Sequence, residues 1–134
     1  MRILLLAAAL AFTGCSGGST ANAPAFPEKL EPAWSRSAVQ PMDAVKFPAI
    51  VKSAGIQQAW QTEYRSPDGA VVRVDAYAVK SNTQGLDLAQ RWLKERDNAQ
   101  FYTDHYLLNV AWQGAKHDEL ASLVRSLPKL IEQQ

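Results

Sequence analysis

Cysteine is almost absent from this 134-residue chain, which carries a single one at Cys15. One thiol excludes an intramolecular disulfide and any metal site built from several cysteines. Continuous basic segments are also missing, since the 14 Lys and Arg residues are scattered and the net charge is only +1. A nucleic-acid binder needs a basic stripe to neutralise phosphates, so we expect no nucleic-acid partner.

The motifs of common catalytic and metal sites are missing as well. The chain has two histidines, His105 and His117, and neither lies in an H-E-x-x-H pattern. No G-x-S-x-G nucleophile motif occurs. We therefore predict no catalytic residue, no bound metal, no cofactor and no enzymatic activity. The alternative left open is a small envelope enzyme that uses His105 or His117 with the neighbouring acidic residues.

A hydrophobic run long enough to cross a membrane is not found at the N-terminus. The run Ile3–Phe12 has ten residues, whereas a membrane-spanning helix needs about 20. A short apolar run behind Arg2 and ahead of small residues is typical of a secretory signal peptide. We expect residues 1–14 to be such a peptide. Cleavage after Ala23, at an A-x-A site, is a competing possibility.

The end of this leader contains the lone cysteine. The segment Phe12-Thr13-Gly14-Cys15 resembles the lipobox of bacterial lipoproteins, with Phe12 in the position where Leu is usual. The resemblance covers only the leader. It implies cleavage before Cys15, attachment of lipid to its sulfur, and a membrane of the bacterial cell envelope as the location. Ser16 in place of Asp implies the periplasmic face of the outer membrane, if the host has two membranes.

The rest of the chain divides into two parts by composition. Residues 15–41 are rich in Ser, Gly, Ala, Asn and Pro and read as a flexible linker after the lipidated cysteine. Residues 42–134 show alternating and helical periodicities that predict a single globular domain. The expected elements are a weak helix at 43–54, strands at 56–65 and 70–80, a helix at 83–98, strands at 100–103 and 106–113, and a helix from about 118 onward.

Two strand pairs separated by helices predict an α+β domain. We expect a small antiparallel sheet built from two hairpins, with two or three helices on one face. Ser66-Pro67-Asp68-Gly69 suits the turn of the first hairpin. The small side of the second strand, from Val72 to Ala78, is the expected bed for the helix at 83–98. Pro128 is expected to kink or end the last helix.

The other side of that second strand supplies the only candidate contact patch. Arg73, Asp75 and Tyr77 alternate along it and would stand in a row if this side faces outward. The alternative is a solvated strand face held by cross-strand pairs. The sequence therefore favours a membrane-anchored envelope lipoprotein that acts as a non-catalytic binding or interaction module, with an envelope protein as a possible partner. A structural or assembly component of an envelope complex is a further alternative.

Overall fold

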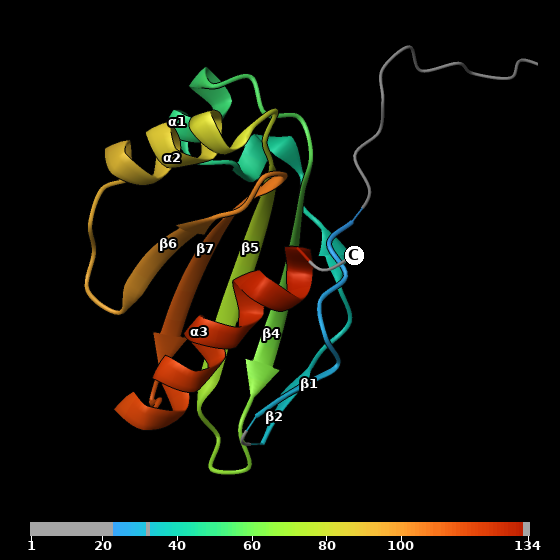
Figure 1. Ribbon diagram of the computed structural model, residues 1–134, viewed down its shortest axis with the longest axis vertical. Helices are drawn as coiled ribbons and strands as arrows, with labels where there is room; N and C mark the ends of the chain where they lie inside the picture. The colour runs from blue at the N-terminus through green and yellow to red at the C-terminus, as the bar shows by residue number, and fades with distance from the viewer. Residues whose placement is uncertain (1–22, 32, 133–134) are drawn as a thin grey trace, which may run out of the picture.

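The α+β class expected from the sequence is confirmed. The computed structural model describes residues 23–31 and 33–132, and Figure 1 shows their arrangement around one antiparallel sheet. The strands are β1 (Lys29–Leu30), β2 (Trp34–Arg36), β3 (Gln40–Pro41), β4 (Ala59–Arg65), β5 (Val71–Ala78), β6 (Asn98–Tyr102) and β7 (Tyr106–Gln113). The helices are the short 3₁₀ helix η1 (Ala44–Lys46), α1 (Ala49–Ser53), α2 (Asn82–Arg91) and α3 (His117–Glu132).

Two hairpins, β4–β5 and β6–β7, lie side by side in the sheet, as predicted. The strand order is β1-β2-β4-β5-β7-β6, and β3 also pairs with β4. In the first hairpin, the backbone N–H of Gly69 donates to the carbonyl of Ser66 at 3.1 Å, which closes the expected turn. The hairpins join through β5 and β7, which pair over eight residues from Val71↔Gln113 to Ala78↔Tyr106.

One face of the sheet is covered by α3, which crosses it diagonally in Figure 1. Val72, Val74 and Ala76 of β5 are buried on this face, and α3 packs its own apolar side against the same core. The helix side of the contact consists of Leu120, Leu123, Leu127 and Ile131. The helix continues through Pro128 to Glu132, so the proline does not end it.

The opposite face is covered at one end only, by η1, α1 and α2, which gather at one end of the sheet in Figure 1. Tyr77 and Leu107 point to this face because they alternate with Ala76 and Leu108, and they pack with Leu88 of α2 in a second core. The expectation that the helices share one face is therefore wrong. The small-residue bed is occupied by α3, and α2 lies instead over the large ring of Tyr77.

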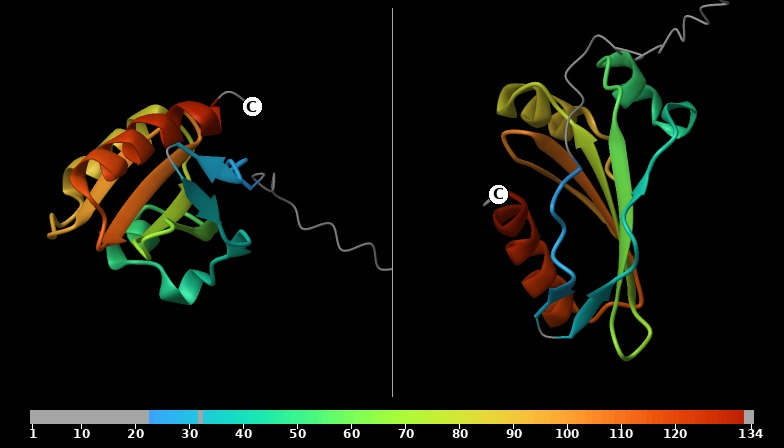
Figure 2. Two further views of the ribbon diagram at one scale, coloured as in Figure 1. Left: turned by 90° about the horizontal axis from the view of Figure 1, so that it is seen from below. Right: turned by 90° about the vertical axis from the view of Figure 1, so that its right-hand side faces the viewer.

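Residues 23–41 are not the flexible linker that their composition suggested. Trp34 is 1% exposed, and Phe26 and Leu30 are also buried in the core under α3. The Tyr64 hydroxyl donates to the carbonyl of Pro27 at 2.8 Å. Figure 2 shows this segment running between α3 and the sheet before it joins the sheet edge. The globular part therefore begins nearly twenty residues before the expected boundary at residue 42.

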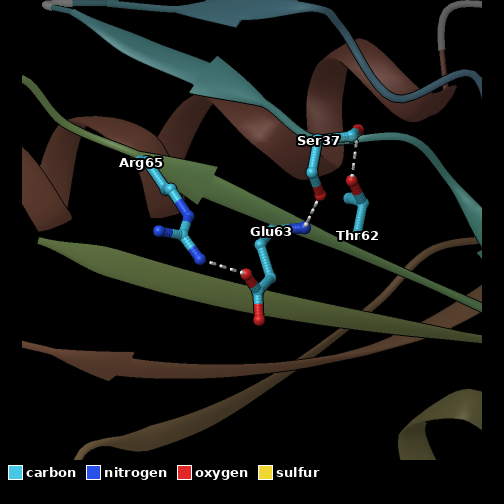
Figure 3. Close-up of polar contacts among 4 residues, drawn as sticks. All are labelled: Ser37, Thr62, Glu63 and Arg65. Carbon is cyan, nitrogen blue, oxygen red and sulfur yellow. Dashed lines mark hydrogen bonds and ion pairs between the residues drawn. The ribbon is translucent and has the colours of Figure 1, made fainter.

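Polar contacts fasten the end of this segment to β4, as Figure 3 shows. The Thr62 hydroxyl donates to the carbonyl of Ser37 at 3.0 Å, and the backbone N–H of Glu63 donates to the Ser37 hydroxyl at 3.1 Å. Glu63 also pairs with Arg65 at 3.2 Å. The two bonds of Ser37 attach the chain between β2 and β3 to β4. The N-terminal segment is therefore an integral edge of the sheet.

The signal peptide at 1–14 and the lipid-attachment residue Cys15 lie outside the described residues, so both remain predictions. In the part of the chain that the structure describes, none of the helices has the length and apolar character required to span a bilayer.

Candidate functional site

The uncovered half of the second sheet face carries a row of polar side chains. The strand registers place Gln61 of β4 opposite Asp75 of β5, Asp75 opposite Asn109 of β7, and Asn109 opposite Gln100 of β6. Because residues directly opposite one another project to the same face, the four side chains form a line across the sheet. We call these four residues the polar row.

Hydrogen bonds connect the polar row from both ends toward Asp75. Gln61 Nε2 donates to Asp75 Oδ1 at 2.8 Å, and Gln100 Nε2 donates to Asn109 Oδ1 at 3.1 Å. Gln100 Nε2 also contacts Asn98 Oδ1. The side-chain hydrogen bond of Asn109 to Asp75 completes the line. With its Oδ1 accepting from Gln100, Asn109 has its NH₂ group left to donate to the carboxylate.

Asp75 is a buried acid in this row, with only 3% of its surface exposed. Burial raises the pKa of its carboxyl above the ordinary value, because desolvation disfavours the charged form. The hydrogen bonds from Gln61 and Asn109 and the charge of Arg73 oppose this increase. Arg73 Nε lies 3.6 Å from Asp75 Oδ1, and about half of the Arg73 side chain is exposed. The arginine thus connects a buried carboxylate to the surface.

A cavity of about 340 Å³ lies over this part of the sheet. Its floor comes from β4, β5 and β7, and its wall comes from the segment 41–48 that contains η1. The floor residues are Gln61, Arg73, Asp75, Tyr77 and Asn109, and the wall residues are Pro41, Met42, Asp43, Lys46 and Pro48. We call this cavity the sheet cleft. Its volume falls in the range of small-molecule sites, about 300–1,000 Å³.

The wall of the sheet cleft is held in position by local and sheet contacts. Asp43 caps η1, since its Oδ1 accepts from the backbone N–H of Val45 at 3.0 Å. The backbone N–H of Met42 donates to the carbonyl of Ala59 on β4 at 2.8 Å. Phe47 packs edge-on against Tyr77, with ring centroids 5.6 Å apart. The cleft therefore has a fixed shape between two attached elements.

A second hollow of about 510 Å³ adjoins the sheet cleft toward the opposite end of the strands. Arg73 lines both cavities. Charged residues line this second hollow, among them Glu63, Glu95 and Arg96. Arg73 is therefore the residue at which the two hollows meet.

The three residues proposed as a contact patch are brought together in the sheet cleft, but not as an exposed row. Arg73 is exposed, whereas Asp75 and Tyr77 are buried. Tyr77 is covered by Phe47 and Trp92 of the second core. In place of a flat exposed patch, the structure has a cavity whose floor includes all three residues.

Sequence reasoning missed Gln61, Asn109 and Lys46, which complete the sheet cleft. The position of Gln61 opposite Asp75 follows from the first hairpin turn, and this signal was available in the sequence. Asn109 and Lys46 come from segments whose placement depends on distant contacts.

The two histidines lie on different elements of the fold. His105 lies in the connection between β6 and β7, where its backbone N–H donates to the Thr103 hydroxyl at 3.2 Å and its carbonyl accepts from Val79 at 2.9 Å. His117 is the first residue of α3. Within residues 23–31 and 33–132, no group of three His, Cys, Asp or Glu residues is arranged to hold a metal ion.

Comparison of the chain with protein-family models, with curated proteins and with solved structures finds no match.

Proposed function

We propose that this protein is a bacterial envelope lipoprotein that binds a ligand in the sheet cleft without catalysing a reaction. The lipid on Cys15 would hold it at a membrane, and the folded domain would present the cleft to the envelope. The observation that carries the binding role is the convergence of Gln61, Asp75 and Asn109 in a cavity beside Arg73.

Burial of these polar groups supports a binding role because burial is costly for stability. A buried carboxylate loses hydration, and its partners restore only part of that loss. Apolar residues at these positions would extend the second core without that cost. A few polar groups held in a preformed cavity are typical of ligand sites, where they fix orientation and specificity.

The anchoring half of the proposal rests on the lipobox-like segment that ends in Cys15. The test is mass spectrometry of the protein purified from membranes of its own host, alongside the Cys15→Ala variant. We expect the wild-type chain to begin at Cys15 with acyl groups attached. The variant should leave the membrane fraction or remain unprocessed. A mature chain that begins at Pro24, or an unmodified Cys15 thiol, would refute the anchor.

The binding half is tested by hydrogen exchange on the same native material. Protein taken from its membranes in mild detergent is compared with protein that has been unfolded, washed and refolded. We expect slower exchange in the native sample over the cleft residues 41–48 and 73–77 and equal exchange over α3. If the native and refolded samples exchange equally over residues 41–48 and 73–77, no ligand remains bound in the cleft through purification.

A further inference from the structure

We propose that the sheet cleft recognises a ligand through a single carboxylate, which the guanidinium of Arg73 binds with support from Lys46. This inference rests on the proposed binding function and assigns its ligand class. Both cations line the same cavity, one from the floor and one from the wall. Their side chains thus approach one ligand from two independent elements, β5 and η1.

Arg73 is held so that part of its guanidinium remains available. Its Nε lies 3.6 Å from Asp75 Oδ1, and this is its only ion pair among the residues that the structure describes. Glu63, which stands directly opposite Arg73 on β4, pairs with Arg65 instead. The guanidinium carries five N–H donors in a planar fork, so engagement of Nε leaves the Nη edge for a planar oxyanion.

Asp75 acts on the ligand indirectly, as a positioning residue for Arg73. Its carboxylate is fixed by the hydrogen bonds from Gln61 and Asn109, so the ion pair starts from a rigid partner. A rigid partner lowers the entropy that Arg73 would otherwise lose when a ligand binds. The polar row therefore has a use that a purely structural set of amide pairs would lack.

Lys46 is the second cation of the sheet cleft. It is exposed at the end of η1 and, within the described part of the chain, forms no ion pair of its own. Asp43 is the nearby acid on the wall, and its Oδ1 accepts the backbone N–H that caps η1. An ammonium group without a partner at the rim favours an incoming anion.

The charge balance favours a carboxylate over a phosphate. Lys46 and Arg73 are matched in the lining by Asp43 and Asp75, so the cleft has two charges of each sign. A phosphate dianion doubles both its attraction to the two cations and its repulsion from the two acids, whereas the cost of removing it from water rises with the square of its charge. A lining with balanced charges therefore favours a monoanion. The side-chain amide of Gln61 lines the same cavity. An amide can exchange hydrogen bonds with another amide, so the cleft suits a ligand that carries a carboxylate beside an amide.

The test is an NMR titration of the full mature chain, as purified from its host in detergent micelles, with two small probes. N-acetylalanine carries a carboxylate beside an amide, and N-acetylalaninamide replaces that carboxylate with a neutral amide. We expect N-acetylalanine to shift the backbone signals of residues 41–48 and 73–77, with affinity at least roughly tenfold above that of the neutral probe. Inorganic phosphate, the third probe, is expected to bind more weakly than N-acetylalanine.

Variants connect the binding to the two cations. Arg73→Gln is expected to lower the affinity for N-acetylalanine by at least about tenfold, and Lys46→Gln by about threefold. Arg73→Lys retains the charge without the fork and should fall between wild type and Arg73→Gln. Arg125→Gln is the matched control, because Arg125 is an exposed arginine on α3, which covers the other face of the sheet, and it lines neither cavity. It should bind as the wild type does.

Three results would overturn the inference. Equal binding of the two alanine probes would keep the cleft as a binding site and remove the carboxylate from its recognition. Phosphate that binds as tightly as N-acetylalanine would assign a different anion. Absence of shifts at the cleft with every probe would refute the carboxylate site, whereas the hydrogen-exchange comparison on native material tests the proposed binding function separately.

Discussion

Replacing Trp34 with alanine tests whether the N-terminal segment is part of the fold. The side chain is 1% exposed in the core between α3 and the sheet, and its Nε1 donates to the carbonyl of Glu119 at 3.4 Å. Removal of a buried tryptophan leaves a cavity and costs about 3–5 kcal/mol. Domains of this size are stable by only about 5–15 kcal/mol, so the loss is a large fraction of the total.

The assay is equilibrium unfolding in urea, followed by circular dichroism. With a slope of about 2 kcal/mol per molar urea, the loss corresponds to a midpoint lower by roughly 1.5–2.5 M. Ser35→Ala is the control, because Ser35 is the exposed neighbour on the same short strand. It should change the free energy of unfolding by less than about 0.5 kcal/mol. If Trp34→Ala changes stability as little as Ser35→Ala does, the segment behaves as a linker and the account of the fold is refuted.

Three further predictions concern single contacts. Tyr64→Phe deletes the hydroxyl that donates to the carbonyl of Pro27 at 2.8 Å, and it should lower the free energy of unfolding, measured by urea titration, by about 1 kcal/mol. An unchanged free energy would show that this hydrogen bond does not stabilise the fold. Gly85→Ala places a Cβ 2.9 Å from the Cβ of Tyr102, so overpacking should outweigh the gain in helix propensity and lower the thermal midpoint; a higher midpoint would contradict the close packing of α2 on β6. Burial raises the pKa of Asp75 above 3.8, so between 3.8 and that raised pKa the folded protein holds a proton that the unfolded chain has released, and stability from this group falls as pH rises through the window. Asp75→Asn should remove this pH dependence from urea midpoints measured across the acidic range, and identical pH profiles for variant and wild type would refute it.

The hairpins were predictable because their information is local. The turn Ser66-Pro67-Asp68-Gly69 sets the register of β4 and β5, and that register places Gln61 opposite Asp75. Alternation along β5 also separated Val72 and its small neighbours from the side that carries Arg73. Half of the polar row could therefore be derived from a turn and a period of two.

The remainder depended on contacts between distant segments. The pairing of Asp75 with Asn109 crosses the whole of α2 and β6, and no local pattern fixes which residues of β5 and β7 meet. The choice of helix for each face was likewise a global matter, decided by the longer apolar stripe of α3. The small residues on one side of β5 correctly predicted that a helix packs there. They could not show that this helix is α3 and not α2.

The N-terminal segment was misread for a different physical reason. The strands β1, β2 and β3 have two or three residues each, too few to show a period. Small residues and proline dominate up to Pro27, with Ala, Ser and Gly the small residues, and composition alone assigns such a stretch to a linker. The signal that was present consisted of Phe26, Leu30 and Trp34, three large apolar residues spaced by four, and the core under α3 buries all of them.

This earlier start of the domain changes what an anchor at Cys15 would do. Only eight residue steps separate Cys15 from Ala23, the first residue that the structure describes, in place of the 26 steps to Pro41. Eight steps can span at most about 26–29 Å even when fully extended. A lipid at Cys15 would then keep the domain within about its own diameter of the bilayer, since a domain of this length has a radius of gyration near 13 Å. Such a geometry favours a ligand found at or near the membrane surface over one that must be reached across a wide periplasmic gap.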